Sequence, residues 1–184
     1  MKSYNNIKYK ELNLDDFHSN LLKKFNRYQE TNIVLYKQKN DYNYKSDHFI
    51  DQWDDEKKKV VIQSLKNCIK QRGIVTGAFL KEDLIGFASV EGQLFGSNNE
   101  YLELSFIHIS NEFRYKGIGR KLFNLCCVKA SQKGAKKLYI AAHPSQETQA
   151  FYKSVGCKYA AEINQKIYKK EPLDIQLEIV LSHL

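Results

Sequence analysis

Residues 107–122 constrain the fold more than any other part of the chain, because an isoleucine-rich strand end there runs into a basic turn and a helix start. Gly117 and Gly119 fall in the first turn of the predicted helix, where each glycine costs about 1 kcal/mol relative to alanine. A helix N-terminus presents unpaired N–H groups and a partial positive charge, and glycines let a ligand come close to them. The segment therefore predicts a strand, a turn and a helix that can bind a pyrophosphate. Positive side chains at the same end add to the attraction: Arg114, Lys116, Arg120 and Lys121.

The sequence of residues 107–122 is also compatible with a tight strand-to-helix turn that carries ordinary surface lysines. Two well-known phosphate-binding sites are excluded by spacing. The third glycine of G-x-G-x-x-G would fall at Leu122, and no G-x-x-x-x-G-K-[ST] occurs in the chain. Neither a Rossmann dinucleotide site nor a P-loop is supported.

Hydrophobic periodicity predicts helices and strands around this segment. Apolar residues recur mostly at four-residue steps over 54–72, which indicates a helix, and they alternate over 101–109, which indicates a strand. Residues 26–52 are polar and poorly periodic, and are expected to form a loop. The order of elements describes an α/β or α+β mixed sheet with helices on both faces. The other expected elements are a strand over 7–12, a short helix over 15–25, a hairpin of 77–80 and 84–90, a helix over 117–133, a strand over 138–142, a helix over 146–155, and strands over 159–163 and 175–181.

The composition favours one domain over residues 1–184. Pro144 and Pro172 are the only prolines, and no Gly/Ser-rich linker or internal repeat marks a boundary. No stretch approaches the roughly 20 apolar residues of a membrane helix, and residues 1–6 lack the apolar core of a secretory signal. The cytoplasm is therefore the expected compartment. The formal net charge of +8 favours an anionic partner without choosing among nucleic acid, a membrane surface and a phosphate-bearing cofactor.

The cysteines and histidines do not form a metal-binding pattern. Cys68, Cys126, Cys127 and Cys157 include no C-x-x-C pair, and the five histidines are scattered without H-E-x-x-H spacing. We expect reduced, mostly buried thiols and no metal site.

A second motif lies at residues 149–157, where a short predicted helix carries the aromatic pair Phe151 and Tyr152 and ends at Gly156. Together the two segments resemble the GNAT superfamily of N-acetyltransferases. Its motif A is [Q/R]-x-x-G-x-[G/A] at a strand-to-helix turn, and its motif B is close to A-x-x-F-Y-x-x-x-G-F. The resemblance covers about residues 101–159 and is specific to the superfamily, but not to any substrate. It implies a central mixed, mostly antiparallel sheet of about six or seven strands with about four flanking helices, and two strands splayed apart at the cofactor cleft.

The resemblance also implies that acetyl-CoA, the acyl donor of that family, binds along the strand end and the following turn. The main chain near Ile107 and Ile109 would hydrogen-bond the pantetheine and the acetyl carbonyl, and the turn would hold the pyrophosphate through backbone N–H groups. Ser145 stands where many members carry an asparagine that contacts the cofactor, which leaves its side-chain contact open. The implied cofactor-binding residues are Ile107, His108, Ile109, Arg114, Tyr115, Lys116, Gly117, Ile118, Gly119, Arg120 and Ser145.

The resemblance implies one catalytic acid. Tyr152 matches the tyrosine that, in many members, lies beside the thioester sulfur and protonates the leaving thiolate. An aromatic side chain at helical spacing is otherwise more often a core residue, so this role depends on the motif.

A catalytic base is needed as well, because an amine is mostly protonated at neutral pH. Glu103 matches the glutamate base of the histone-acetylating branch, and strand alternation predicts that it faces the same side as Ile107 and Ile109. Partial burial would raise its pKa toward neutrality. A solvent-facing glutamate fits the pattern equally well, and His143 is an alternative proton acceptor.

The expected reaction is transfer of an acetyl group to a primary amine of a small molecule or a peptide, by direct attack in a ternary complex. No cysteine has a recognisable nucleophile context, so no acyl-enzyme is expected. Residues 26–52 and the acidic residues around Trp53 are the expected acceptor contacts, although Asp54 and Asp55 equally suit capping of the next helix.

Two other functions remain open from the residues. A noncatalytic acyl-CoA sensor would keep the same turn, and a nucleic-acid-binding domain would use the positive charge. No basic stripe with interleaved aromatics occurs, so we expect neither a nucleic-acid nor a membrane partner. A homodimer is compatible with the family. The acceptor amine, the range of acyl groups and the identity of the base stay undetermined.

Overall fold

The computed structural model describes residues 6–39 and 41–181. Residues 1–5, over which the sequence predicts no apolar signal segment, lie outside the described ranges. The elements in chain order are β1 (Ile7–Glu11), the 3-10 helix η1 (Leu14–Asp16), β2 (Tyr28–Gln38), β3 (Asp41–Gln52), α1 (Asp55–Lys70), β4 (Ile74–Leu80), β5 (Asp83–Val90), β6 (Tyr101–Ile109), the 3-10 helix η2 (Asn111–Phe113), α2 (Ile118–Gln132), β7 (Lys137–Ala142), α3 (Gln146–Ser154), β8 (Lys158–Tyr159), α4 (Gln165–Tyr168) and β9 (Ile175–Val180).

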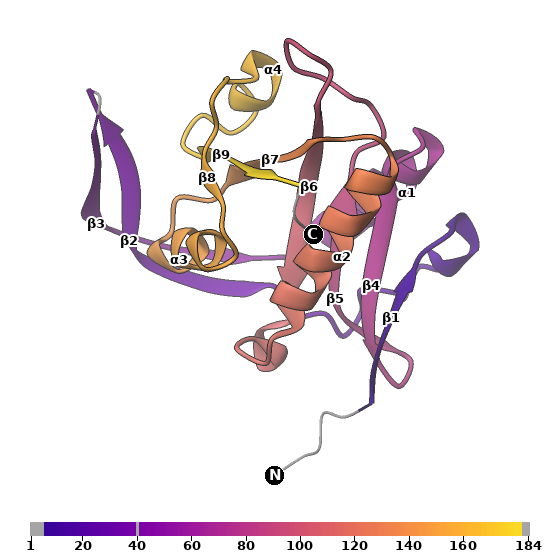
Figure 1. The fold of residues 1–184 in the computed structure, drawn as a ribbon. Coiled ribbons are helices and arrows are strands. Elements are labelled where there is room, and N and C mark those ends of the chain that lie inside the picture. Colours follow the sequence, from indigo (N-terminus) through magenta and orange to yellow (C-terminus); the bar gives the residue numbers. More distant parts are fainter. Residues whose placement is uncertain (1–5, 40, 182–184) are drawn as a thin grey trace.

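Seven strands form one sheet in the order β1-β4-β5-β6-β7-β9-β8, and β2 and β3 form a separate hairpin. Neighbouring strands are antiparallel except β6 and β7, which are parallel. Figure 1 shows α2 crossing one face of the sheet, α1 on the opposite face, and the hairpin reaching outward past α3. We call these two sides of the sheet the α2 face and the α1 face. The predicted mixed, mostly antiparallel sheet with helices on both faces is confirmed.

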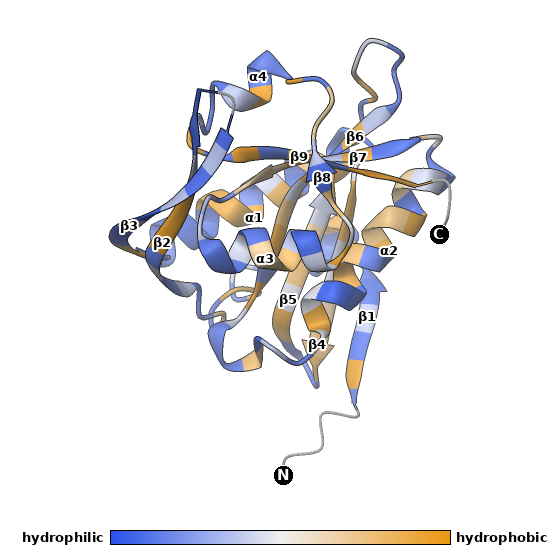
Figure 2. Cartoon of the chain, turned by 60° about the vertical axis from the view of Figure 1, so that its left-hand side comes forward, coloured by the Kyte–Doolittle hydropathy of each residue, from blue (hydrophilic) through white to orange (hydrophobic). Residues whose placement is uncertain are grey.

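Helix α2 lies at the centre of the core on its face. Ile118, Leu122 and Phe123 are at most 1% exposed, and they pack in one cluster with Ala88 of β5 and Leu104 of β6. Figure 2 shows hydrophobic residues along much of α2, as the sequence predicts. Truncation of a buried leucine to alanine typically costs about 2–5 kcal/mol. This packing fixes the N-terminus of α2 relative to the end of β6.

Helix α1 begins at a capped N-terminus. Asp54 Oδ1 accepts a hydrogen bond from the backbone N–H of Lys57 at 2.7 Å, which satisfies one of the unpaired donors of the first turn. Leu65 and Cys68 are buried against Val75 of the sheet. Asp54 therefore has the capping role that the sequence allowed.

Residues 26–52 contain a β-hairpin and not the predicted loop. β2 and β3 pair from Tyr28↔Gln52 to Gln38↔Asp41, with an irregularity between Thr31 and Ile33. No residue of β3 is fully buried. Hydrophobic alternation in a sequence reflects burial of one face, so a hairpin with so little burial leaves a weak periodic signal.

Two shorter predictions are also wrong. Residues 15–25 form no α-helix: after η1, which has a capping box with Asn13, the chain continues in turns. Phe17, Leu21, Leu22 and Phe25 are nevertheless buried, so an irregular segment folded onto the core produced helix-like spacing. Only Tyr159 of the strand predicted over 159–163 is in a strand, the two-residue β8. The short α4, which is too brief to show a period, had no predicted counterpart.

Strand β6 contains a β-bulge at Ser105. Ser89 of β5 pairs with Phe106, and the next residue of β5, Val90, pairs with Leu104. Ser105 is therefore the extra residue on β6. A bulge of this kind shifts the alternation of side chains by one position.

The bulge corrects the predicted orientation of Glu103. Ile107 and Ile109 pack in the cluster under α2, as do Leu102 and Leu104. Because Glu103 alternates with Leu102 and Leu104, it lies on the α1 face, opposite to Ile107 and Ile109. Simple alternation predicted the same side and is wrong here, since nothing in the sequence marks the bulge.

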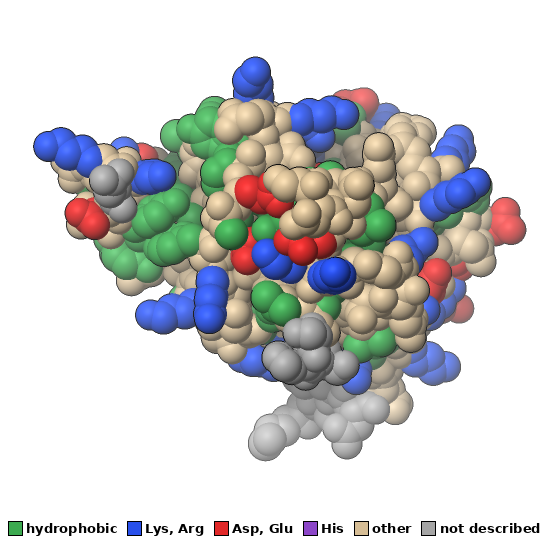
Figure 3. Space-filling view, turned by 45° about the horizontal axis from the view of Figure 1, so that its top comes forward, with side chains coloured by type: hydrophobic (Ala, Val, Ile, Leu, Met, Phe, Trp, Pro, Cys, Tyr) green, Lys and Arg blue, Asp and Glu red, His purple; other side chains and the backbone are tan. Residues whose placement is uncertain are grey.

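No helix within the described ranges has the length and hydropathy of a membrane span. Figure 3 shows the Lys and Arg side chains on one face of the molecule in separate groups, with Asp and Glu side chains between them. Although the chain has a net charge of +8, the Lys and Arg side chains on that face do not form a single basic stripe.

Candidate functional site

Strands β6 and β7 separate partway along their length. They pair only over residues 101–103 and 137–139. Beyond Glu103, β6 continues to Ile109 along β5, while β7 continues to Ala142 along β9. We call this divergence the splay. It leaves the β7-facing edge of residues 104–109 without a strand partner in the described sheet, so its backbone groups can bind a ligand.

Helix α2 starts beside the splay, and its N-terminus is uncapped. Its N-cap, Gly117, has φ +76°, and no side chain caps the helix. The three other described α-helices are each capped by a side chain, from Asp54, Ser145 and Asn164. A Cβ added to Gly117 would have no heavy atom within 4 Å. The first N–H groups of α2 therefore carry the unsatisfied donors and partial positive charge of a helix start, next to open space.

Two arginines lie at this helix start. Arg120 donates from Nη1 to the carbonyl of Ser154 at 3.2 Å and from Nη2 to its Oγ at 3.1 Å, which ties α2 to the end of α3. Arg114 is half-buried and donates from Nε to the carbonyl of Ile109 at 3.4 Å. Both place positive charge at the turn.

The other residues of the turn differ in exposure. Tyr115 is 85% exposed, and Lys116 is exposed, with Nζ donating to a backbone carbonyl of the same turn. Ile118 is buried in the core, so it can offer a ligand only its backbone. A Cβ added to Gly119 would lie 3.4 Å from the Phe151 ring of α3. Residues 114–120 thus come together as predicted, with motif B packed against them.

Ile107, His108 and Ile109 lie on the unpaired edge of β6. The side chains of Ile107 and Ile109 pack toward α2. Ile109 lies close to the helix start, since its Cγ1 is 3.8 Å from a Cβ added to Gly119. The backbone groups of this edge point in the plane of the sheet toward the splay.

His108 points to the α1 face. Its ring lies 4.9 Å from that of Trp53 and 5.7 Å from that of Phe87. Burial, followed by the positive charges of Arg27 and Arg114, holds the pKa of His108 well below its usual value. The imidazole is therefore neutral at neutral pH.

Tyr152 lies on α3 and is 5% exposed. Its ring packs against those of Phe151 at 5.2 Å and Phe123 at 6.2 Å. Burial raises the pKa of its hydroxyl, and the neighbouring Cys157 and Asp174 raise it further. Tyr152 stays protonated at neutral pH, which is the form that a proton donor needs.

Glu103 lies where the splay begins, opposite Tyr139 in the last paired position. Burial raises the pKa of its carboxyl and Glu91 adds to this, whereas Lys170 and Lys166 lower it. The structure thus places a half-buried carboxylate with a raised pKa at the base of the splay.

His143 follows β7 directly and contacts the hairpin. Its Nε2 lies 3.4 Å from Oδ2 of Asp51, and its ring lies 5.5 Å from that of Phe49. Its Nδ1 accepts a hydrogen bond from the N–H of Ser145 at 3.2 Å, which places the proton of the neutral ring on Nε2. Burial lowers the pKa of His143, although Asp51 opposes this. Since the lone pair of the neutral ring is engaged, this geometry does not favour His143 as the proton acceptor.

Ser145 has a structural role in the hairpin contact. Its Oγ accepts from Nε2 of Gln29 at 3.0 Å and from the N–H of Thr148 at 3.3 Å, and donates to Oγ1 of Thr148 at 2.9 Å. The hydroxyl is thus engaged within the protein. The predicted cofactor contact of Ser145 stays a prediction.

Two residues of this region carry no motif and were missed. Arg27, just before β2, is 8% exposed, and its charge acts on the pKa of His143. Asp174, just before β9, has its pKa raised to about 7 by burial and by Glu171 and Asp51. Both come from segments without periodic or motif signals, so the sequence offered nothing that could have identified them.

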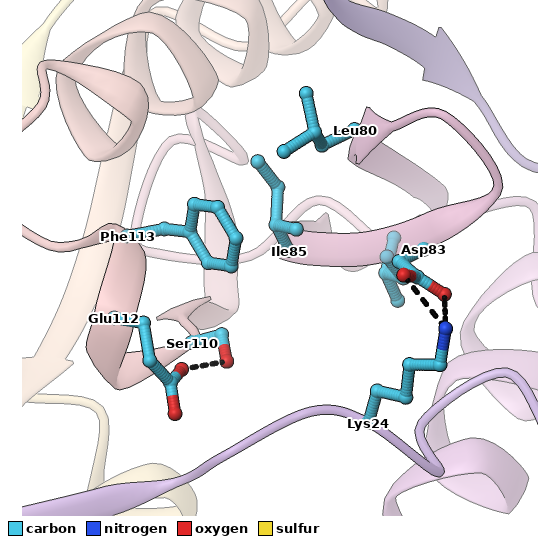
Figure 4. A pocket seen from close by; sticks show the side chains of 8 residues that line it. Lys24, Leu80, Asp83, Ile85, Ser110, Glu112 and Phe113 are labelled. Atoms are coloured by element: carbon cyan, nitrogen blue, oxygen red, sulfur yellow. Dashed lines mark hydrogen bonds and ion pairs between the residues drawn. The ribbon is translucent and has the colours of Figure 1, made fainter. Parts of the chain in front are cut away.

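A separate pocket of about 170 Å³ lies between η2 and the β4–β5 hairpin. Figure 4 shows Phe113 and Ile85 on opposite sides of it, with the Lys24–Asp83 ion pair (2.9 Å) at one end. Ligand pockets usually measure about 300–1,000 Å³. Because the pocket is smaller than that and residues 114–120 do not line it, it is not the cofactor site.

The described residues contain no group of three or more His, Cys, Asp or Glu side chains arranged to hold a metal ion. All four cysteines are free, and three of them are buried, which confirms the predicted state of the thiols. Burial raises the pKa of Cys157 to about 12. That thiol is protonated at neutral pH and is a poor nucleophile.

Comparison with known proteins agrees with this geometry. Residues 34–157 match the family described as "Acetyltransferase (GNAT) family". No curated protein has a sequence that matches the chain.

Solved acetyltransferase structures share the fold. Nourseothricin acetyltransferase has 15% identity and a TM-score of 0.69, with 95% of this chain and 98% of that chain covered. An aminoglycoside 6'-N-acetyltransferase complexed with coenzyme A has 14% identity and a TM-score of 0.61, with 95% and 97% covered. A GNAT family acetyltransferase from Elizabethkingia anophelis with acetyl-CoA bound has 17% identity and a TM-score of 0.56, with 95% and 98% covered. At such identities the likeness shows the fold alone.

The family match supplies what these structural likenesses do not. It spans most of the hairpin, the splay, the uncapped start of α2 and the motif B helix. The chain therefore belongs to the GNAT family of acetyltransferases.

Proposed function

We propose that this protein is an N-acetyltransferase that transfers the acetyl group of acetyl-CoA to a primary amine of a small molecule or a peptide, by direct attack within a ternary complex. The observation that carries the proposal is the uncapped N-terminus of α2 at Gly117, beside the edge of β6 that β7 leaves unpaired. The match to an acetyltransferase family supports an enzyme over a noncatalytic acyl-CoA sensor.

The residues at the splay fit this acyl donor. The open space at Gly117 and the unpaired N–H groups of residues 117–120 suit a diphosphate. Arg114, Lys116 and Arg120 supply positive charge beside it. The unpaired edge of β6 suits the amide groups of a pantetheine, in the way that an added strand pairs with a sheet edge. Acetyl-CoA, when bound, supplies a thioester that an unprotonated amine can attack.

Proton transfer falls to side chains on either side of the splay. Tyr152, whose hydroxyl stays protonated, would donate a proton to the departing sulfur. Glu103, at the base of the splay, would take the proton of the amine directly or through a water molecule. Asp174 is a second carboxylate with a raised pKa, and its charge acts on Tyr152. Either carboxylate could therefore be the base, and substitution of each in turn distinguishes them.

A panel of primary amines with acetyl-CoA, followed by release of free thiol and by mass spectrometry of the product, tests the proposal. We expect amine-dependent thiol release, with intersecting initial-rate lines when both substrates are varied. An acetyl group carried by Cys157 on the pathway would contradict the direct mechanism. Tight CoA binding without thiol release across the panel would indicate a sensor instead.

A further inference from the structure

Arg27 is a buried cation with two guanidinium nitrogens that lack hydrogen-bond partners among the described residues. It is 8% exposed, and neither Nε nor Nη1 has a hydrogen-bond partner in the part of the chain that the structure describes. Burial and the charge of Arg114 lower its pKa to about 10, against the opposing effect of Asp51. Arg27 is still protonated at neutral pH. A buried charge without hydrogen bonds is unfavourable unless a ligand completes it.

The backbone around Arg27 is fixed at the end of β6. Its carbonyl accepts from the N–H of Trp53 at 3.3 Å. The preceding residue, Asn26, donates its N–H to Oγ of Ser110 at 3.0 Å and accepts from the N–H of Asn111 at 2.9 Å. An arginine anchored so firmly has a well-defined position, which favours recognition of a ligand over a mobile surface charge.

Arg27 lies on the α1 face. Its carbonyl accepts from the N–H of Trp53, whose ring packs on His108 and Phe87 on that face, and its charge acts on the pKa values of His108 and His143. The start of α2 lies on the other face. Arg27 is thus on the side of the splay that the acyl donor is not expected to fill.

Asp51 is an acidic residue near Arg27, but the two form no ion pair among the described residues. Asp51 raises the pKa of Arg27, but its Oδ2 lies against Nε2 of His143 at 3.4 Å and has no hydrogen-bond partner among the described residues. Arg27 therefore keeps two donor nitrogens, Nε and Nη1, for an anion, and Asp51 keeps an acceptor for a cation.

We propose that Arg27 binds the carboxylate of the acceptor, so that the preferred substrate is an amino-acid-like amine. This inference rests on the proposed function of the same site. A guanidinium presents N–H donors in a fork that matches a carboxylate, which makes arginine well suited to this group. The ammonium end of the acceptor then lies toward Asp51 and Asp174, which influence each other electrostatically.

Two other ligands explain Arg27 less well. The diphosphate of the acyl donor has its own place at Gly117 on the α2 face. A polyamine would be attracted by Asp51, but Arg27 and Arg114 would repel it.

Amino acids and their amides, which carry the same amine with and without a carboxylate, test the inference. The wild-type protein should acetylate the acids with a kcat/KM roughly 10- to 100-fold above that of the amides, as expected for hydrogen bonds to a charged group. Arg27→Met should bring this ratio close to one without changing the KM for acetyl-CoA, and Arg27→Lys should keep part of it. Arg72→Met, which removes an exposed arginine, is the matched control and should leave the ratio unchanged.

Equal or faster acetylation of the amides, or of diamines without a carboxylate such as putrescine, would overturn the inference and leave the proposed function intact. Thiol release with other primary amines but with no amino acid would also overturn the inference. Absence of thiol release across the whole amine panel would contradict the proposed function instead, and calorimetric binding of the acids and amides to wild type and Arg27→Lys would then still test Arg27. If Arg27→Met does not fold, the wild-type ratio and its reduction in Arg27→Lys decide the question. No wild-type preference for the acids would contradict the inference.

Discussion

Nε2 of His143 lies 3.4 Å from Oδ2 of Asp51, so the residue that follows β7 contacts the end of β3. The hydrogen bond from Gln29 to Ser145, at 3.0 Å, joins β2 to the same loop. These contacts hold the hairpin against the loop between β7 and α3. The hairpin therefore supplies Asp51, and the residue just before it supplies Arg27, to the side of the splay where we expect the acceptor to bind.

Gly117→Ala is expected to raise the KM for acetyl-CoA about tenfold, which corresponds to about 1.4 kcal/mol. A left-handed backbone costs other residues about 1–2 kcal/mol, so the substitution displaces the N–H groups that bind the diphosphate. Gly134→Ala is a matched control at the other end of α2, since Gly134 has φ +88° and also no atom within 4 Å of an added Cβ. The control should lose similar stability in urea but keep its KM. A similar rise of KM in both variants would contradict the role of Gly117.

Tyr152→Phe is expected to lower kcat about 100-fold or more, the usual size of an acid–base contribution, with little change in either KM. The ring contacts with Phe123 and Phe151 are kept, so the thermal midpoint should stay close to that of wild type. Tyr101→Phe removes a hydroxyl that donates to Glu178 at 2.6 Å, and serves as the control with unchanged kcat. An undiminished kcat in Tyr152→Phe would exclude the hydroxyl as the proton donor.

Glu103→Gln is expected to remove the acidic limb of the pH profile. Only the ionised carboxylate accepts a proton, so kcat/KM of the wild type should fall as the pH drops through the pKa of Glu103, which burial raises. The measurement is kcat/KM from pH 5 to pH 9 for wild type, Glu103→Gln and Asp174→Asn. Loss of the limb in Asp174→Asn, with the limb kept in Glu103→Gln, would show that Asp174 is the base.

Asp174 is expected to make stability depend on pH. Burial raises its pKa from 3.8 to about 7 in the folded protein, so between these values the folded protein binds a proton that the unfolded chain has lost. Its contribution is then most favourable below the lower value and declines as the pH rises toward 7. Urea unfolding at pH 5 and pH 8 should show a larger loss of stability for wild type than for Asp174→Asn. Equal losses would mean that the pKa of Asp174 is not raised.

The sequence predicts the elements whose signals are local. β6 has the predicted bounds, Tyr101–Ile109, and α1 and α2 differ from prediction by one or two residues at each end. Each of these elements buries its apolar residues on one side or, for α2, on most sides. The apolar residues therefore recur in the sequence with a clear period. Gly117 has a left-handed backbone conformation that strongly favours glycine. The turn could therefore be predicted from the sequence.

The remaining features depend on contacts between distant segments. The bulge at Ser105 reversed the orientation predicted for Glu103, because only the pairing with β5 reveals it. The mostly exposed β2–β3 hairpin has little hydrophobic periodicity. Arg27 and Asp174 take their surroundings from other parts of the chain, so no local pattern could mark them as site residues.

Backbone amide NMR of the wild-type protein during a titration with CoA tests the central claim most directly. The account predicts that the largest and saturable shifts belong to the N–H groups of residues 117–120, followed by those of residues 107–109. Saturable binding that leaves these signals in place and shifts others, or no binding at all, would contradict it.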